Sequence, residues 1–167
     1  MFSDEARFGR MNRYDRAGRR FARDPRSPPN SFANTSIFMA VSPKDGTCVY
    51  LIMPTSNTAC FQAFLDVLAR RFVRQDVLLV LDGAPNHRSS ELVLPDNITL
   101  LYLPPYSPEL NPKENLWDEI REKIFKNYAL KSMDAVRAKL KQAILYIERN
   151  PKIVRSITSF PYIANSI

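Results

Sequence analysis

The sequence predicts an α/β domain in which helices cover a mixed β-sheet. Two β-prone runs, residues 36–42 and 47–53, flank the short turn segment 43–46 and predict an antiparallel hairpin. Two continuous apolar runs, residues 76–82 and 98–103, are typical of parallel strands buried on both faces. Helical spacing of apolar residues before and after these runs predicts the helices that cover the sheet.

The first 26 residues combine a short strand with a basic segment. We expect the strand to include Phe2 and to end at Asp4, the first acidic residue. Arginines recur about every three residues after it, a spacing that fits neither a strand nor an ideal helix and predicts an irregular, solvated segment. This segment is either an arm that contacts phosphates or a charged surface loop. Its arginines are Arg7, Arg10, Arg13, Arg16, Arg19, Arg20, Arg23 and Arg26.

Polar start signals and apolar stripes predict three helices. Residues 55–72 predict one helix, residues 112–125 a second with Asn111 as its N-cap, and residues 133–149 a third that starts after Ser132. Pro151 is expected to close the third helix. The apolar stripes that these helices would bury are Phe61, Phe64, Leu65 and Leu68, then Leu116, Ile120 and Ile124, then Val136, Leu140, Ile144 and Ile147.

Length and composition predict a single domain over residues 1–167 with a nucleic-acid partner. The chain carries a net charge of +7 with a pI near 9.6, which favours a polyanionic ligand. Its longest aliphatic run, residues 77–81, is too short to cross a membrane, and no signal peptide opens the sequence. Cys48 and Cys60 have no metal-type spacing, so we expect a reduced, cytoplasmic setting.

Four prolines brace the segment before Glu114. Each proline fixes its own φ and restricts the residue before it, so the segment holds its exit rigidly. Glu114 then falls in the first helical turn, where it is either a metal ligand or part of a capping box with Asn111. The prolines are Pro104, Pro105, Pro108 and Pro112.

Three carboxylates are expected at one rim of the sheet. Asp82 directly follows an apolar strand, Asp4 ends the first strand, and Glu114 starts a helix after a third strand. The carboxyl ends of parallel strands are where ligands gather in such sheets. Hard oxygen ligands suit Mg²⁺ or Mn²⁺, and a pair of such ions stabilises both oxygens of a phosphodiester displacement.

Three motifs carry a resemblance to a known family. They are "SDEARFG" at residues 3–9, "DGAPNHRS" at 82–89 and "LPPYSPELNPKENLW" at 103–117. In this order they resemble the catalytic domain of mariner-type DDE transposases, in the bacterial insertion-sequence branch. The resemblance covers nearly the whole chain.

The resemblance implies a ribonuclease H-like mixed sheet flanked by helices, here with its first strand truncated. It implies that Asp4, Asp82 and Glu114 are the catalytic triad and bind two Mg²⁺ or Mn²⁺ ions. The implied activity is metal-dependent DNA cleavage followed by strand transfer. Nucleic-acid contacts are expected from Arg7, Arg10, Arg13, Arg16, His87 and Arg88.

The family also carries helix-turn-helix domains ahead of the catalytic domain. Only three residues precede Asp4, so we expect a polypeptide from an upstream reading frame to supply them, or the chain to be a remnant. A homodimer on DNA, in the bacterial nucleoid and without a membrane partner, is the expected complex. The alternative functions are a catalytically silent DNA-binding remnant and a stand-alone ribonuclease H-like nuclease.

Three further residues receive expected roles. His87, the only histidine, is expected to contact DNA or to orient a carboxylate. Asp118, one turn after Glu114, is the substitute carboxylate if Glu114 is not a ligand. Trp117 is expected in the core, with stacking on DNA as the alternative.

Overall fold

The computed structural model describes residues 1–9, 34–105, 107, 110–122 and 132–160. The strands are β1 (Phe2–Gly9), β2 (Asn34–Val41), β3 (Cys48–Met53), β4 (Val77–Leu81) and β5 (Ile98–Tyr102). The helices are α1 (Thr58–Arg71), the 3₁₀ turn η1 (Pro85–His87), α2 (Lys113–Ile120), α3 (Met133–Glu148) and α4 (Pro151–Thr158).

The five strands form one mixed sheet in the order β3-β2-β1-β4-β5. β2 pairs antiparallel with β1 and with β3, whereas β1, β4 and β5 run parallel. β1 pairs with β2 along its whole length but with β4 only at Phe2 and Val80. The two central strands therefore separate beyond that pair. This arrangement confirms the predicted mixed α/β sheet.

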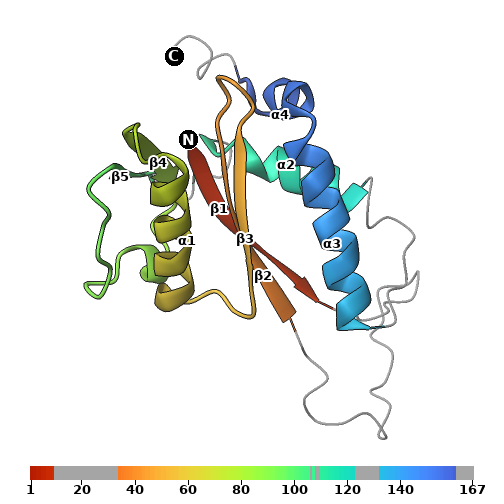
Figure 1. Cartoon of the computed structure of the whole chain (residues 1–167), viewed down its shortest axis with the longest axis horizontal. Helices are drawn as coiled ribbons and strands as arrows, with labels where there is room; N and C mark the ends of the chain where they lie inside the picture. The colour runs from red at the N-terminus through yellow and green to blue at the C-terminus, as the bar shows by residue number, and fades with distance from the viewer. Residues whose placement is uncertain (10–33, 106, 108–109, 123–131, 161–167) are drawn as a thin grey trace, which may run out of the picture.

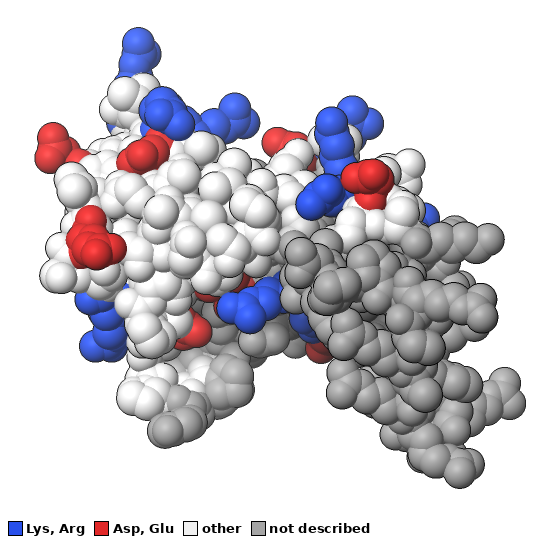
Figure 2. All heavy atoms as spheres, turned by 90° about the horizontal axis from the view of Figure 1, so that it is seen from below, with Lys and Arg blue, Asp and Glu red and all other residues white. Residues whose placement is uncertain are grey.

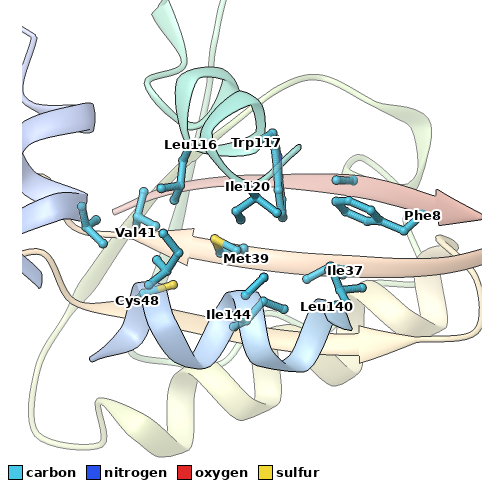
Figure 3. Close-up of a cluster of buried hydrophobic side chains, with 14 of the residues drawn as sticks. Phe8, Ile37, Met39, Val41, Cys48, Leu116, Trp117, Ile120, Leu140 and Ile144 are labelled. Carbon is cyan, nitrogen blue, oxygen red and sulfur yellow. The ribbon is translucent and has the colours of Figure 1, made fainter. Parts of the chain in front are cut away.

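Helices cover both faces of the sheet, and each face has its own core (Figure 1). On one face α1 packs Phe61, Phe64 and Leu68 against strand residues that include Phe38 and Leu79. On the other face α2, α3 and α4 pack against β1, β2 and β3. Figure 3 shows this second core, in which side chains of α2 and α3 meet Ile37 and Met39 of β2.

Local sequence explains where two helices begin. The side chain of Asn57 accepts a hydrogen bond of 2.9 Å from the backbone N–H of Cys60 at the start of α1. Ser132 accepts one of 3.1 Å from Ala135 at the start of α3. The predicted start of α3 after Ser132 is confirmed, and α1 begins within the predicted segment 55–72, at Thr58.

One predicted strand boundary is wrong, and one helix was not predicted. β1 does not end at Asp4 but continues to Gly9, because β2 supplies a full ladder of partners for its polar residues. The predicted end of the third helix before Pro151 is confirmed, because α3 ends at Glu148. Pro151 then begins the additional helix α4, since a proline is well tolerated in the first helical turn.

The start of α2 also differs from its prediction. The helix begins at Lys113, and Pro112 occupies the N-cap position, one residue after the predicted N-cap. Asn111, predicted as the N-cap, is buried and donates a hydrogen bond of 3.4 Å to the carbonyl of Ser3 in β1. The α-helical part ends at Ile120, and the predicted positions Ile124 and Phe125 lie outside the described residues.

The neighbouring strands β4 and β5 are not buried on both faces as predicted. Leu78 and Leu101 are each 50% exposed, while Leu79 and Leu81 on the opposite face are fully buried. The helices of the second face cover β1, β2 and β3 and leave this part of the sheet open. Both cysteines are free and buried. Among the described helices, none has the length and apolarity needed to span a membrane.

The β2–β3 hairpin depends on Gly46, whose φ is +78°. A Cβ built on Gly46 would lie 2.2 Å from the carbonyl oxygen of Pro151, so the hairpin tip packs directly on the start of α4. Only glycine satisfies both the left-handed backbone and this close approach.

We predict that Gly46→Ala destabilises the fold by about 2 kcal/mol or more, because the left-handed backbone costs 1–2 kcal/mol and the methyl group would also displace Pro151. Urea unfolding followed by circular dichroism measures the loss. Lys44→Ala, an exposed position in the same turn, serves as the control and should change stability by about 0.5 kcal/mol at most. Equal effects of the two substitutions would contradict the prediction.

Candidate active site

A cleft opens where β1 separates from β4. Its volume is about 560 Å³, and both Asp4 and Asp82 line it. Phe2 pairs with Val80, and Asp4 and Asp82 each lie two residues after this pair. Asp82 directly follows the last residue of β4. Across the sheet, the strand numbers fall from β3 to β1 and then rise from β4 to β5, so the switch point of the topology lies between β1 and β4. Ligands of open α/β sheets bind at such a point. Other residues lining the cleft are Gly83, Ala84, Arg88, Leu103, Pro104, Pro105, Ser107 and Asn111.

Asp82 is held in one orientation by two groups that follow it in the chain. Its Oδ1 accepts a hydrogen bond of 3.1 Å from the backbone N–H of Ala84 and lies 2.7 Å from Nδ1 of His87. The side chain of Asp82 is nonetheless 57% exposed. One oxygen is therefore anchored while the carboxylate remains accessible from the cleft.

His87 joins Asp82 to a second acidic residue, Glu5 of β1. The imidazole is 1% exposed and its Nε2 lies 2.8 Å from Oε1 of Glu5. Both ring nitrogens face carboxylates, which can only accept hydrogen bonds when they are ionised, so the arrangement favours an imidazole that donates from both nitrogens. Burial lowers the pKa of His87, but the hydrogen bond and charge of Glu5 and the charge of Asp82 outweigh it and raise the pKa above its ordinary value.

The His87–Glu5 pair is fixed by its surroundings. Asn86 donates a hydrogen bond of 2.9 Å to the same Oε1 of Glu5. The hydroxyl of Tyr102 donates one of 2.7 Å to the backbone carbonyl of His87, and the ring of Phe61 lies 4.4 Å from the imidazole. His87 is therefore a buried, fixed group within hydrogen-bond distance of Asp82.

Asp4 is oriented from the opposite face of the sheet. Its Oδ1 accepts a hydrogen bond of 2.8 Å from the backbone N–H of Glu5, and its Oδ2 accepts one of 3.1 Å from the indole N–H of Trp117. Trp117 is 1% exposed and packs edge-on against Phe8, with ring centroids 6.0 Å apart. The prediction that Trp117 belongs to the core is confirmed, and the hydrogen bond to Asp4 is an addition to it.

Glu114 is the second residue of α2, and its side chain lies outside what the structure describes. The position of its helix is nevertheless well defined. Trp117, three residues later, ties α2 to Asp4, and Asn111 just before the helix bonds to the backbone of β1. Pro104 and Pro105 line the cleft on the way to this helix. Both neighbours thus hold the start of α2 against the strand that carries Asp4.

The donor set in the cleft fits a hard divalent cation. Asp4 and Asp82 supply carboxylate oxygens, and each carboxylate is hydrogen-bonded in the way that orients metal ligands. Within the described residues, no three His, Cys, Asp or Glu side chains form a metal site. The side chain of Glu114, the third predicted ligand, lies outside the described residues.

The basic residues expected to bind nucleic acid are only partly described. Arg7 is exposed on β1 and Arg88 is exposed in the cleft, whereas Arg10, Arg13 and Arg16 lie outside the described residues. On the face shown in Figure 2, the described basic and acidic side chains are scattered rather than gathered into one basic stripe. The described part of the chain therefore offers Arg88 as the basic residue in the cleft.

Two site features were missed by sequence reasoning. No role was predicted for Glu5, although it is the partner of His87, and the hydrogen bond from Trp117 to Asp4 joins residues far apart in the chain. Asp118, the substitute ligand, is 71% exposed and lies 3.4 Å from Arg121 on the surface of α2. It is not among the residues that line the cleft.

Comparisons with known proteins agree with this geometry. Residues 1–137 match the family described as DDE superfamily endonuclease. The uncharacterized protein y4pE/y4sA of Sinorhizobium fredii is 40% identical over 101 residues, which cover 60% of this chain and 75% of that protein.

Solved structures of Mos1 transposase share the fold. The catalytic domain of Mos1 mariner transposase matches with a TM-score of 0.60 and 17% identity, over 93% of this chain and 76% of the other. The Mos1 mariner paired end complex with Mn matches with a TM-score of 0.58 and 18% identity, over 95% of this chain. The chain spans 55% of the Mos1 chain in that complex. The predicted ribonuclease H-like fold is confirmed.

We predict that Glu5→Ala destabilises the protein by about 3 kcal/mol, because it leaves Nε2 of the buried His87 and the amide of Asn86 without their hydrogen-bond partner. Chemical denaturation measures the loss. Asp118→Ala removes an acidic residue from an exposed ion pair and is the matched control, with an expected change of about 0.5 kcal/mol or less. A loss at Glu5 no larger than that at Asp118 would show that the buried pair contributes little.

Proposed function

The chain belongs to the DDE superfamily endonuclease family, and on that premise we propose that its cleft cleaves phosphodiester bonds of DNA. The observation that carries the proposal is that Asp4 and Asp82 line the same cleft, each oriented by hydrogen bonds. A silent remnant has no need of such orientation, because the arrangement brings two like charges together at a cost.

We propose that Asp4, Asp82 and Glu114 together hold two divalent ions, Mg²⁺ or Mn²⁺. When bound, such ions supply the Lewis-acid chemistry of phosphodiester cleavage. The chain's own part is positional: Trp117 and the backbone of Glu5 hold Asp4, while His87 and the backbone of Ala84 hold Asp82. The rigid proline segment and the tie from Asn111 to β1 support placing Glu114 at the same cleft.

The proposal extends to DNA transposition. Solved structures with this fold include complexes of Mos1 transposase with a left transposon end and a Mos1 strand transfer complex. By analogy, residues 1–167 form one catalytic domain that cuts an element end and joins it to target DNA. Recognition of the element end, and pairing of two catalytic domains, then require helix-turn-helix domains and a second copy of the chain. Action in the bacterial nucleoid follows from the same proposal.

A plasmid-nicking assay tests the nuclease proposal. With Mn²⁺, the wild-type chain should convert supercoiled DNA to relaxed circles, and the purified Asp82→Asn variant should lose at least about a hundredfold in rate, because the variant lacks one anionic ligand. Asp118→Asn, the matched carboxylate on the surface of α2, should retain the wild-type rate. If wild type and Asp82→Asn are equally inactive, the silent remnant is the correct function; preferential cutting of an RNA–DNA hybrid would indicate a stand-alone nuclease.

We also predict that Mg²⁺ or Mn²⁺ stabilises the fold, because a cation relieves the repulsion between converging carboxylates. At a hundredfold excess over Kd, the gain is about 2.7 kcal/mol, or about 5–10 °C in Tm. Asp4→Asn, Asp82→Asn and Glu114→Gln should each remove most of this shift, whereas Asp118→Asn should leave it intact. Thermal unfolding with and without metal provides the measurement. A wild-type Tm that is indifferent to millimolar metal would count against the triad.

A further inference from the structure

The cleft contains one described basic residue, Arg88, in an unusual position. Its guanidinium carbon lies 4.4 Å from the centre of the Tyr102 ring, in cation–π contact. The same side chain lines the cleft together with Asp4 and Asp82. Arg88 is exposed and forms no ion pair with any other described residue, although two carboxylates line the same space.

The guanidinium of Arg88 also lies close to Gly83. A Cβ built at Gly83 would lie 2.9 Å from Nε and 3.0 Å from Nη2 of Arg88. Among the described glycines, Gly46 has a positive φ and Gly83 does not. The backbone conformation at position 83 therefore does not require a glycine. What its missing side chain provides is room for the guanidinium. The guanidinium of Arg88 therefore lies close to both the backbone at Gly83 and the ring of Tyr102.

The Tyr102 ring is itself fixed. Its hydroxyl donates a hydrogen bond of 2.7 Å to the carbonyl of His87, and His87 is bound to Asp82 and Glu5. The guanidinium is consequently positioned by the same buried cluster that orients Asp82. Little side-chain entropy remains to be lost when an anion binds to it.

From this geometry we infer that Arg88 binds a phosphate oxygen of a nucleic-acid strand that lies in the cleft beside Asp4 and Asp82. The planar guanidinium matches the oxygens of a phosphodiester, and its permanent charge offsets the acidic character of the cleft for a polyanionic ligand. The inference rests on the proposed function, because it places the reacting strand at the cleft. Gly83 and Tyr102 are the positioning residues of this contact.

Binding of a fluorescently labelled DNA duplex across a salt series tests the inference. In Ca²⁺, Arg88→Ala should weaken binding about tenfold and reduce the slope of log K against log salt by about 0.9, the value of one lost phosphate contact. Arg74→Ala removes an exposed arginine at the opposite end of β4 and should leave the slope unchanged. Each variant is first shown to keep the wild-type Tm shift with Mn²⁺, which excludes damage to the carboxylates.

The variant Gly83→Ala tests the position of the Arg88 guanidinium separately from its charge. The added methyl group displaces the guanidinium without changing the net charge, so this variant should weaken binding about as much as Arg88→Ala. The double variant should bind no more weakly than Arg88→Ala alone, because both changes remove the same contact. Arg88→Lys, which keeps the charge but not the planar fork, should fall between wild type and Arg88→Ala.

The outcomes distinguish this inference from the nuclease proposal. Equal salt slopes for wild type and Arg88→Ala, or an equal loss in Arg74→Ala, would overturn the inference even if the chain cleaves DNA. A slope reduced by Arg88→Ala alone would support it even if the wild-type chain cuts nothing. Where cleavage is seen, a substrate with a neutral methylphosphonate in place of the phosphate at the cut position should be cleaved at equal rates by wild type and Arg88→Ala.

Discussion

The separation of β1 from β4 after a single residue pair is the constraint on which the site depends. β4 ends at Leu81, one residue after its pair with β1, so Asp4 and Asp82 both lie past the point where the two strands pair. Beyond this pair, side-chain hydrogen bonds join β1 to the segments that follow β4 and β5. The bridge from His87 to Glu5 lies on the α1 face, and the bond from Asn111 to Ser3 lies beside α2. The opening is thus stabilised by contacts and is not merely an unpaired stretch.

The groups that hold the carboxylates belong to the two cores rather than to mobile loops. Trp117 packs with Phe8 in one core, and His87 lies against Phe61 of the other. A side chain locked by packing keeps its hydrogen-bond partner in a narrow range of positions, which is what a metal or phosphate site requires. The interior of the domain and the chemistry of the cleft are therefore linked: a substitution that loosens either core also loosens one carboxylate.

Local sequence predicts much of this fold but little of its site. Asn57 and Ser132 mark helix starts through bonds to residues three positions away, and the apolar run of β4 predicts that Asp82 follows a strand. The predicted length of β1 was too short because Asp4 and Glu5 interrupt its apolar pattern. Both acidic side chains are bonded to residues more than 80 positions away in the chain. Spacing rules cannot detect such pairs. The exposed faces of Leu78 and Leu101 escape prediction likewise, because which helix covers a strand depends on the path of the whole chain.

The chain's only tryptophan is Trp117, and its indole donates directly to a carboxylate of the cleft. Indole emission responds to the charge and the hydrogen bond at its nitrogen. A cation that draws charge from Asp4 must therefore change the intrinsic fluorescence of the whole protein, with no second indole to obscure the signal. The residue that holds the first carboxylate in place is thus also a spectroscopic reporter of what occupies the cleft, and no label needs to be attached.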